Sequence, residues 1–151
     1  MDAATALKAS SLFKGFTDTG LQIVASICVR HNYPQGTPLF VENMVSDAML
    51  IVAEGKVALT VKGKANEDLS VGEVGPGDWL GELALINTGQ RQCTATATTA
   101  VSAFEIRQAD FQKLMANKPQ ACMKLLMGIV GAVSQKVVDN KEALKSLISK
   151  P

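Results

Sequence analysis

The stretch from residue 81 to residue 95 holds the side chains of this chain that are best suited to bind a ligand. It begins with Gly81 and Glu82, continues through an apolar segment and a polar loop, and ends with a cation, Arg91. A glycine lets another group approach the backbone closely, and an arginine presents a planar, permanently charged fork that fits two phosphate oxygens. Glu82 would repel a phosphate, but its carboxylate is a good acceptor for a sugar hydroxyl beside one. Together these residues indicate a phosphorylated ribose with a single negative charge.

The residues between Glu82 and Arg91 add backbone donors. The run from Leu83 to Ile86 predicts a short apolar helix, whose first N–H groups attract anions. An alternative is that Glu82 and Arg91 form a salt bridge with no ligand. The apolar residues around the pair argue against this alternative, because a buried unpaired arginine is costly and a phosphate would relieve that cost.

This stretch resembles the phosphate-binding cassette of the cyclic nucleotide-binding domain family, with a match in register at Gly81–Leu85 and at Arg91. That family includes the catabolite activator proteins, the regulatory subunits of cAMP-dependent protein kinase and the cyclic nucleotide-gated channels. The resemblance implies a ligand, cAMP or cGMP with cAMP slightly preferred, and no prosthetic group. It implies that Arg91 and the amides of Leu83 and Ala84 hold the phosphate, and that Glu82 holds the ribose.

Other positions complete the expected site or depart from the family pattern. Gln92 stands where relatives usually have Ala, Ser or Thr, so it points away, hydrogen-bonds the ligand or crowds the site. Cys93 fits a structural thiol better than a redox sensor, and Thr94 is either a hydroxyl donor or an ordinary strand residue. Val71 and Leu80, with Gly72 beside Val71, match family positions that face the base, and the same apolar residues also fit the core of a β-roll.

Short apolar runs recur at spacings of about ten residues between glycine-rich turns, which favours a double-sheet jelly roll over βαβ units. We therefore expect a mainly β fold with flanking helices, a double-stranded β-helix jelly roll, in one domain of residues 1–151. The expected parts are N-terminal helices over about residues 3–28, a β-roll over about 29–106 and C-terminal helices over about 108–149. Glu54-Gly55, between two of these apolar runs, predicts the turn of a hairpin.

Composition excludes several classes of protein. A formal charge of +1 lacks the basic footprint of a dedicated nucleic-acid binder. His31 is the single histidine, so neither a multi-histidine metal centre nor a His-based triad is expected, and we place it in an exposed loop. The three cysteines form no CxxC pair and indicate reduced thiols in a cytoplasmic protein. No signal peptide is apparent, and no apolar run approaches the roughly 20 residues of a membrane span, so no membrane contact is expected.

The last predicted helix starts at Pro119, runs towards Leu147 and has two apolar faces. One face packs on the roll, and the other, a heptad seam, favours a homodimer over a monomer with the helix folded back. By similarity to the catabolite activators, Asn140 either reads a purine edge or sets the register of the dimer. The seam comprises Met123, Leu126, Val130, Val133, Val137, Asn140, Leu144 and Leu147, and the second face comprises Cys122, Leu125, Ile129, Ala132 and Val138.

These observations predict a non-enzymatic sensor domain for a cyclic mononucleotide, whose final helix rearranges on binding. The chain stops at Pro151, where transcription factors of the family continue into a helix-turn-helix, so we do not expect this polypeptide alone to bind DNA. The alternative is a degenerate β-roll that acts as a dimerisation or interaction module and binds no nucleotide.

Overall fold

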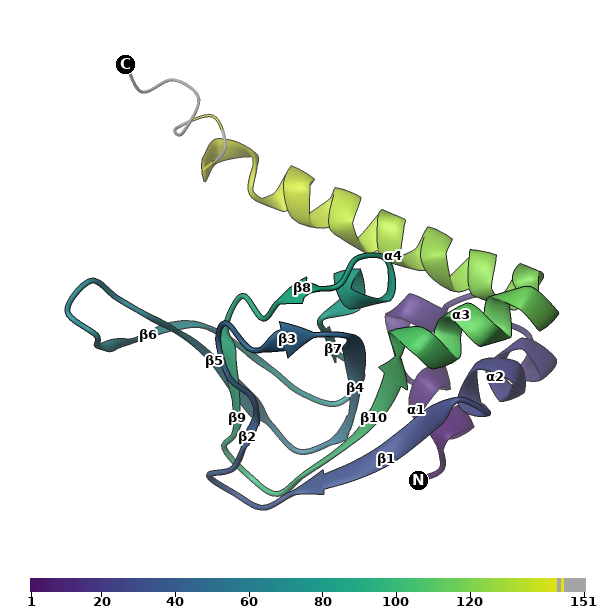
Figure 1. Cartoon of the computed structure of the whole chain (residues 1–151), viewed down its shortest axis with the longest axis horizontal. Coiled ribbons are helices and arrows are strands. Elements are labelled where there is room, and N and C mark those ends of the chain that lie inside the picture. The colour runs from purple at the N-terminus through teal and green to yellow at the C-terminus, as the bar shows by residue number, and fades with distance from the viewer. Residues whose placement is uncertain (144, 146–151) are drawn as a thin grey trace.

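The computed structural model describes residues 1–143 and 145 and consists of two four-stranded antiparallel sheets with helices gathered at one end (Figure 1). One sheet has the order β1-β10-β4-β7, formed by Cys28–Tyr33, Val101–Arg107, Ala48–Glu54 and Trp79–Leu80. The other has the order β2-β9-β5-β6, formed by Pro38–Phe40, Thr94–Ala97, Val57–Lys62 and Asp68–Val74. A short ladder joins β3 (Val45–Ser46) to β8 (Gly89–Gln90). The predicted mainly β jelly roll with flanking helices is confirmed.

The apolar residues of the strands form two cores, one on each side of the first sheet. Between the sheets, Val52, Val57, Ala95 and Ala103 are fully buried, and β9 alternates half-buried and buried positions as a strand with one inward face should. On the helical side, a cluster built around Phe111 packs the helices against β4 and β10. Burial of one such large side chain contributes roughly 1.5–3 kcal/mol, so these two clusters hold the roll and the helices together.

The N-terminal helices begin at side-chain caps. α1 (Ala3–Lys8) starts after Asp2, whose carboxylate accepts the Thr5 N–H at 2.8 Å. A 3-10 turn, η1 (Ser11–Phe13), follows, and α2 (Asp18–Ala25) starts after Thr17, whose hydroxyl accepts the Gly20 N–H at 3.0 Å. These helices end three residues before the predicted boundary, because Cys28 already pairs with Ile106 in β1.

The predicted hairpin at Glu54-Gly55 is wrong. β4 pairs with β10 and β7, whereas β5 pairs with β6 and β9, so this turn carries the chain from one sheet to the other. Gly55 adopts φ +90°, and a Cβ there would lie 2.2 Å from the Ala100 carbonyl oxygen. A turn does lie at Glu54-Gly55, as predicted. The sequence of the two adjacent apolar runs does not indicate that they form strands of different sheets.

The C-terminal helices are α3 (Gln108–Asn117) and α4 (Pro119–Asp139), and Pro119 occupies the first turn of α4 as predicted. The prediction that this helix continues without a break towards Leu147 is wrong. Asn140 leaves the helical conformation, with φ −104° and ψ 18°, and a further helical segment follows at residues 141–143. Leu144 and Leu147 of the predicted seam lie outside the described residues.

The predicted division of α4 into two faces holds only in part. Cys122, Leu125 and Ile129 are buried in the helical core, as expected for the face that packs on the domain. Val138, assigned to the same face, is 63% exposed, and Leu126 and Val133 of the predicted seam pack against that core. The helix leaves the body of the domain towards its C-terminal end, so both faces become exposed there (Figure 1).

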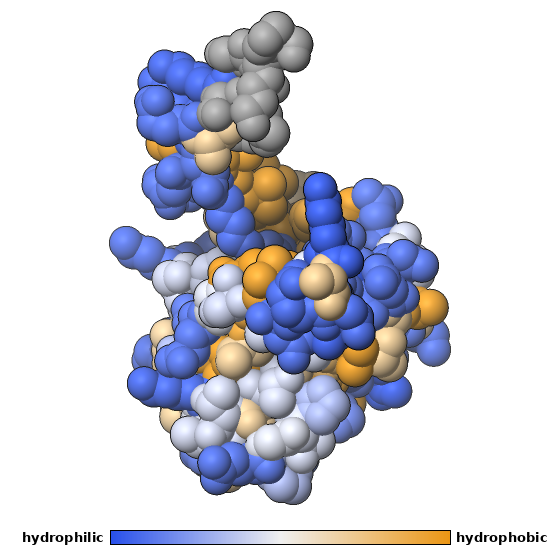
Figure 2. All heavy atoms as spheres, turned by 90° about the vertical axis from the view of Figure 1, so that its left-hand side faces the viewer, coloured by the Kyte–Doolittle hydropathy of each residue, from blue (hydrophilic) through white to orange (hydrophobic). Residues whose placement is uncertain are grey.

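Large apolar side chains are exposed along α4. Figure 2 shows hydrophobic atoms along the column that rises above the roll, and the exposed residues are Met123, Met127, Val130, Val137 and Val138. By length and composition alone α4 could cross a membrane, although polar residues such as Lys124 and Lys136 interrupt its apolar sequence. Its fully buried residues nevertheless belong to the core of the domain, so packing accounts for part of its apolar character.

Candidate functional site

A pocket of about 370 Å³ opens between the cassette, the β3–β8 ladder and α4. It brings together residues that are distant in the sequence, since the strand residue Phe40, the cassette and the helical residue Lys136 all line it. Its lining residues are Phe40, Ser46, Leu80, Gly81, Glu82, Leu83, Ala84, Asn87, Thr88, Gly89, Gln90, Arg91, Gln92, Cys93 and Lys136. Eight of the twelve predicted site residues are therefore in one place.

Gly81 and Arg91 lie next to each other in the wall of this pocket. Gly81 adopts the left-handed conformation with φ +72°, which favours glycine. A Cβ at this position would lie 2.1 Å from Arg91 Nη1 and 3.2 Å from the Ala48 carbonyl oxygen. The glycine is thus required both for the turn into the cassette and for the space that the guanidinium occupies.

Arg91 is buried without a complete set of partners. Its side chain is 8% exposed, its guanidinium carbon lies 4.3 Å from the centre of the Phe40 ring, and Nη1 is buried with no hydrogen-bond partner. Burial lowers the pKa of the Arg91 guanidinium, while the negative charges of Asp47 and Glu105 act in the opposite direction. A guanidinium stays protonated in such surroundings. The pocket therefore presents a fixed positive charge with an unused donor.

Glu82 is buried beside this cation and is paired with a different one. It is 7% exposed, and Lys136 of α4 donates from Nζ to its Oε1 at 2.9 Å. The predicted alternative, a direct salt bridge between Glu82 and Arg91, is not what the described residues form. The carboxylate is instead tied to the final helix.

The short apolar helix predicted after Gly81 is a 3-10 helix, η2 (Glu82–Leu85). The N–H of Ala84 donates to the Gly81 carbonyl oxygen at 3.0 Å, so this amide is used within the turn. The carbonyl of Leu83 accepts from Ile86 and Asn87. Leu83 is 54% exposed, whereas Ala84 is buried.

A second hollow, of about 530 Å³, adjoins the cassette pocket between β5, β6 and α4. Leu80, Cys93 and Lys136 line both spaces, and Leu59 lines the second. Burial raises the pKa of the Cys93 thiol, and the nearby Arg91 opposes this shift, so the thiol form persists at neutral pH.

Four predicted site residues do not line the cassette pocket. Val71 is 54% exposed on β6, and Gly72 beside it has φ +149° with open space where a Cβ would stand. The Thr94 hydroxyl accepts the Glu42 N–H at 2.9 Å, as an ordinary strand threonine can. Asn140 caps α4 and donates from its side chain to the Lys136 carbonyl oxygen at 2.7 Å.

Gln92 does line the pocket, and its side-chain amide donates to the Gln90 carbonyl oxygen at 3.2 Å. This contact ties Gln92 to its own loop, at the wall of the pocket.

The sequence analysis missed Phe40, Leu59 and Lys136. Phe40 and Leu59 lie on strands whose apolar pattern indicates only burial, so no local signal separates a ligand-facing residue from a core residue. Lys136 had a detectable signal, because it lies one helical turn before Asn140 on the helix already expected to reach the ligand. A lysine at this position of a largely apolar helix is therefore a candidate for the site.

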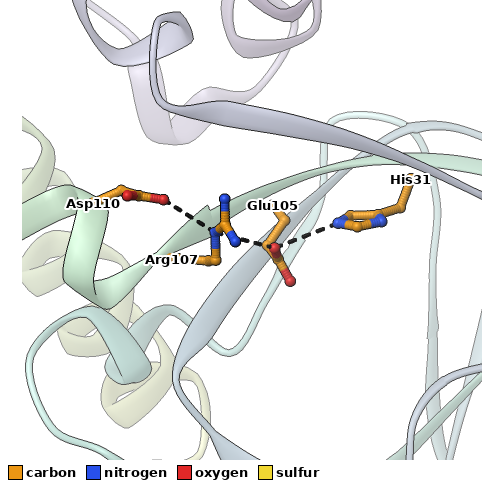
Figure 3. A network of polar contacts seen from close by, with 4 residues as sticks. All are labelled: His31, Glu105, Arg107 and Asp110. Carbon is orange, nitrogen blue, oxygen red and sulfur yellow. Dashed lines mark hydrogen bonds and ion pairs between the residues drawn. The ribbon is translucent and has the colours of Figure 1, made fainter.

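A second cluster of charged residues lies on β1, β10 and the start of α3 (Figure 3). His31 Nε2 lies 3.4 Å from Glu105 Oε1, and Arg107 Nε lies 3.7 Å from Glu105 Oε1 and 3.0 Å from Asp110 Oδ2. The expectation of an exposed loop histidine is wrong, because His31 is a strand residue that pairs with Ala103. Among residues 1–143 and 145 no group of three or more His, Cys, Asp or Glu residues could hold a metal ion.

The family model described as the cyclic nucleotide-binding domain matches residues 30–118, a span that contains the whole cassette. The chain belongs to the cyclic nucleotide-binding domain family. The cyclic AMP receptor protein of Thermus thermophilus is 29% identical over 113 residues, which cover 75% of this chain and 52% of that protein. The cAMP-activated global transcriptional regulator CRP of Salmonella typhimurium is 30% identical over 115 residues, which cover 76% of this chain and 55% of the regulator.

The fold agrees with that of a solved family member. The crystal structure of the Thermus thermophilus catabolite activator protein superposes with a TM-score of 0.81 and 25% identity, and the match covers 91% of this chain and 63% of that one. The chain thus spans about half the length of the two curated relatives above and less than two thirds of this structure.

Proposed function

We propose that this chain is a non-enzymatic sensor domain of residues 1–151 that binds a cyclic mononucleotide in the cassette pocket. The observation that carries the proposal is the unpartnered Nη1 of the buried Arg91. A buried donor without an acceptor costs roughly 1–3 kcal/mol, and more when it is charged. A phosphate oxygen in the pocket would remove that cost, and the guanidinium fork suits two such oxygens.

The charges in the pocket support a ligand with one negative charge. Arg91 and Lys136 supply two positive charges and Glu82 one negative charge, which leaves the pocket one positive charge in excess. A cyclic phosphodiester carries a single negative charge and matches this excess. Glu82 then serves as the acceptor for a ribose hydroxyl, and Leu80 and Leu59 provide an apolar wall for the purine.

Among cyclic mononucleotides we favour cAMP over cGMP. The two relatives matched by sequence are named for cAMP, and each is similar to about three quarters of this chain. The predicted contacts of Val71, Gly72, Thr94 and Asn140 with the ligand belong to the same proposal. None of these four residues lines the cassette pocket, so in this proposal β6 and the end of α4 move towards the ligand, and Thr94 contacts it from β9, directly after the pocket residue Cys93.

We also propose that α4 responds to the ligand and pairs with α4 of a second copy. The helix reaches the pocket through Lys136, and its exposed apolar residues Met123, Met127, Val130 and Val137 face no other part of the described chain. Such exposed apolar side chains in series are typical of an interface. A soluble sensor of this kind acts in the cytoplasm, where it passes the signal to a partner.

Isothermal titration calorimetry of the protein with cAMP, cGMP and 5′-AMP tests the function. We expect saturable binding of cAMP, weaker binding of cGMP and none of 5′-AMP, because the acyclic phosphate carries a second charge and lacks the compact ring. The absence of heat with both cyclic nucleotides at millimolar concentration would leave the empty interaction module as the better description.

A further inference from the structure

Lys136 connects α4 to the cassette. Its Nζ donates to Glu82 Oε1 at 2.9 Å, and the residue lines the cassette pocket, the adjoining hollow and a third hollow between α4 and Leu12. The two partners differ in exposure, since the Lys136 side chain is 61% exposed and that of Glu82 is 9% exposed. The lysine therefore reaches from the solvent side to a buried carboxylate.

Glu82 is also the acceptor that the proposed function assigns to a ribose hydroxyl. An ammonium group and a hydroxyl are both donors, so in the cassette pocket they compete for the same carboxylate. A charged donor is the stronger of the two, but Lys136 is mostly exposed, so water can solvate its ammonium group when it leaves the carboxylate. Ligand entry therefore meets a carboxylate that is already occupied by the chain's own side chain.

We propose that Lys136 is a specificity-determining residue that competes with the ligand's sugar hydroxyl for Glu82. This inference rests on the proposed function. The competition reduces the preference of the pocket for ribose over 2-deoxyribose, because the hydroxyl must displace the ammonium or share the carboxylate with it. It also links the ligand to α4, since a lysine displaced from Glu82 releases the described contact between that helix and the cassette.

The test measures the dissociation constants of cAMP and 2′-deoxy-cAMP for the full chain by calorimetry. The quantity compared is the constant for 2′-deoxy-cAMP divided by the constant for cAMP, which rises as the preference for ribose rises. Both ligands carry the same phosphate and base, so their ratio cancels any general effect of charge on affinity. In Lys136→Met the ratio should rise by about threefold to tenfold over wild type, since the hydroxyl then has Glu82 to itself. Lys136→Arg retains a cationic competitor and should give a ratio near that of wild type.

Lys141→Met is the matched control, because Lys141 carries the same charge, is exposed and lines none of the described hollows near the cassette. Its ratio should equal that of wild type. Should Lys136→Met fail to fold, Lys136→Ala removes the donor altogether, suits a helix and carries the same expectation.

Two results would overturn the inference in distinguishable ways. Binding of both nucleotides with an unchanged ratio in Lys136→Met and Lys136→Ala contradicts the competition and leaves the proposed function intact. Failure of wild type to bind either nucleotide contradicts the proposed function, and the inference is lost with it.

Discussion

Two arginines of this chain lie in opposite kinds of surroundings. Arg107 is half exposed, and carboxylates of Glu105 and Asp110 lie within 4 Å of its Nε (Figure 3). Arg91 is 8% exposed, stacks on Phe40, and has a buried Nη1 without a partner. Arg107 Nε already has carboxylate acceptors, whereas Arg91 Nη1 has no acceptor among the described residues.

This difference in burial and in hydrogen-bond partners underlies the binding role that we propose for Arg91. Surface ion pairs such as that of Arg107 typically contribute about 0–1 kcal/mol, and solvent screens them. A buried cation with an open donor has lost its water and gains most from an anion. Arg107 and Arg91 therefore differ in how many of their donors are still free to accept a ligand oxygen as partner.

The largest expected effect comes from removing each arginine in turn. Arg91→Ala should lower cAMP affinity by at least two orders of magnitude, as expected for the loss of roughly 3 kcal/mol from a charged hydrogen-bonded pair. Arg107→Ala should bind cAMP as wild type does and lose less than about 1 kcal/mol of stability. Calorimetric titration and chemical denaturation of both variants measure these values. Equal losses of affinity in the two variants would remove the distinction.

Gly81→Ala should give the next largest effect. Its Cβ would stand 2.1 Å from Arg91 Nη1, so the guanidinium must move, and a non-glycine residue in the left-handed conformation costs about 1–2 kcal/mol. We expect cAMP affinity to fall by tenfold or more, with some loss of thermal stability. Gly75→Ala is the control, because a Cβ there lies 3.9 Å from the nearest atom and Gly75 does not line the pocket. An unaffected affinity in Gly81→Ala would mean that Arg91 does not need its observed position.

Phe40→Leu should have a smaller effect on binding. The ring lies 4.3 Å from the Arg91 guanidinium carbon, and a cation–π contact of this kind contributes about 0.5–2 kcal/mol. Leucine keeps the site apolar but offers no π face, so affinity should fall severalfold while the fold survives. Phe104→Leu provides the comparison, because Phe104 stacks in the same way with Arg30, away from the pocket. A similar loss of affinity in both variants would assign the effect to the core.

The last effect is absent at neutral pH and concerns two thiols, Cys28 and Cys93. Burial raises the pKa of Cys28 to about 12, whereas the shift of Cys93 in the same direction is opposed by Arg91. Because the unfolded chain loses the Cys28 proton first, stability is complete below about pH 9 and falls from there to about pH 12, by at most about 1.4 kcal/mol per pH unit. Denaturation of wild type and Cys28→Ala across this range should show a shallower decline in the variant. Parallel curves would contradict the assignment.

The sequence predicted the elements better than their arrangement. Turn residues and apolar runs located the strands, and Pro119 marked the start of the last helix, because these signals act over a few residues. The chain crossing from one sheet to the other at Gly55 depends on pairing with distant strands, and no local pattern contains it.

The same limit applies to the site. Gly81, Glu82 and Arg91 form a motif with fixed spacing, so the sequence brought them together correctly. The pairing of Glu82 with Lys136 joins residues 54 positions apart, and it depends on where α4 crosses the cassette. The resemblance to the catabolite activators pointed to Asn140, whereas the residue that lines the pocket is Lys136, one helical turn earlier.

The most direct test of the central claim is thermal unfolding of wild type and Arg91→Ala with cAMP, cGMP or 5′-AMP. A ligand at a hundred times its dissociation constant stabilises the folded state by about 2.7 kcal/mol, which for a chain of this size raises the melting temperature by several degrees. We predict such a rise for wild type with cAMP, a smaller one with cGMP and none with 5′-AMP, and no rise with any nucleotide in Arg91→Ala. An unchanged melting temperature of wild type at millimolar cAMP and cGMP, or an equal rise in Arg91→Ala, would contradict the account.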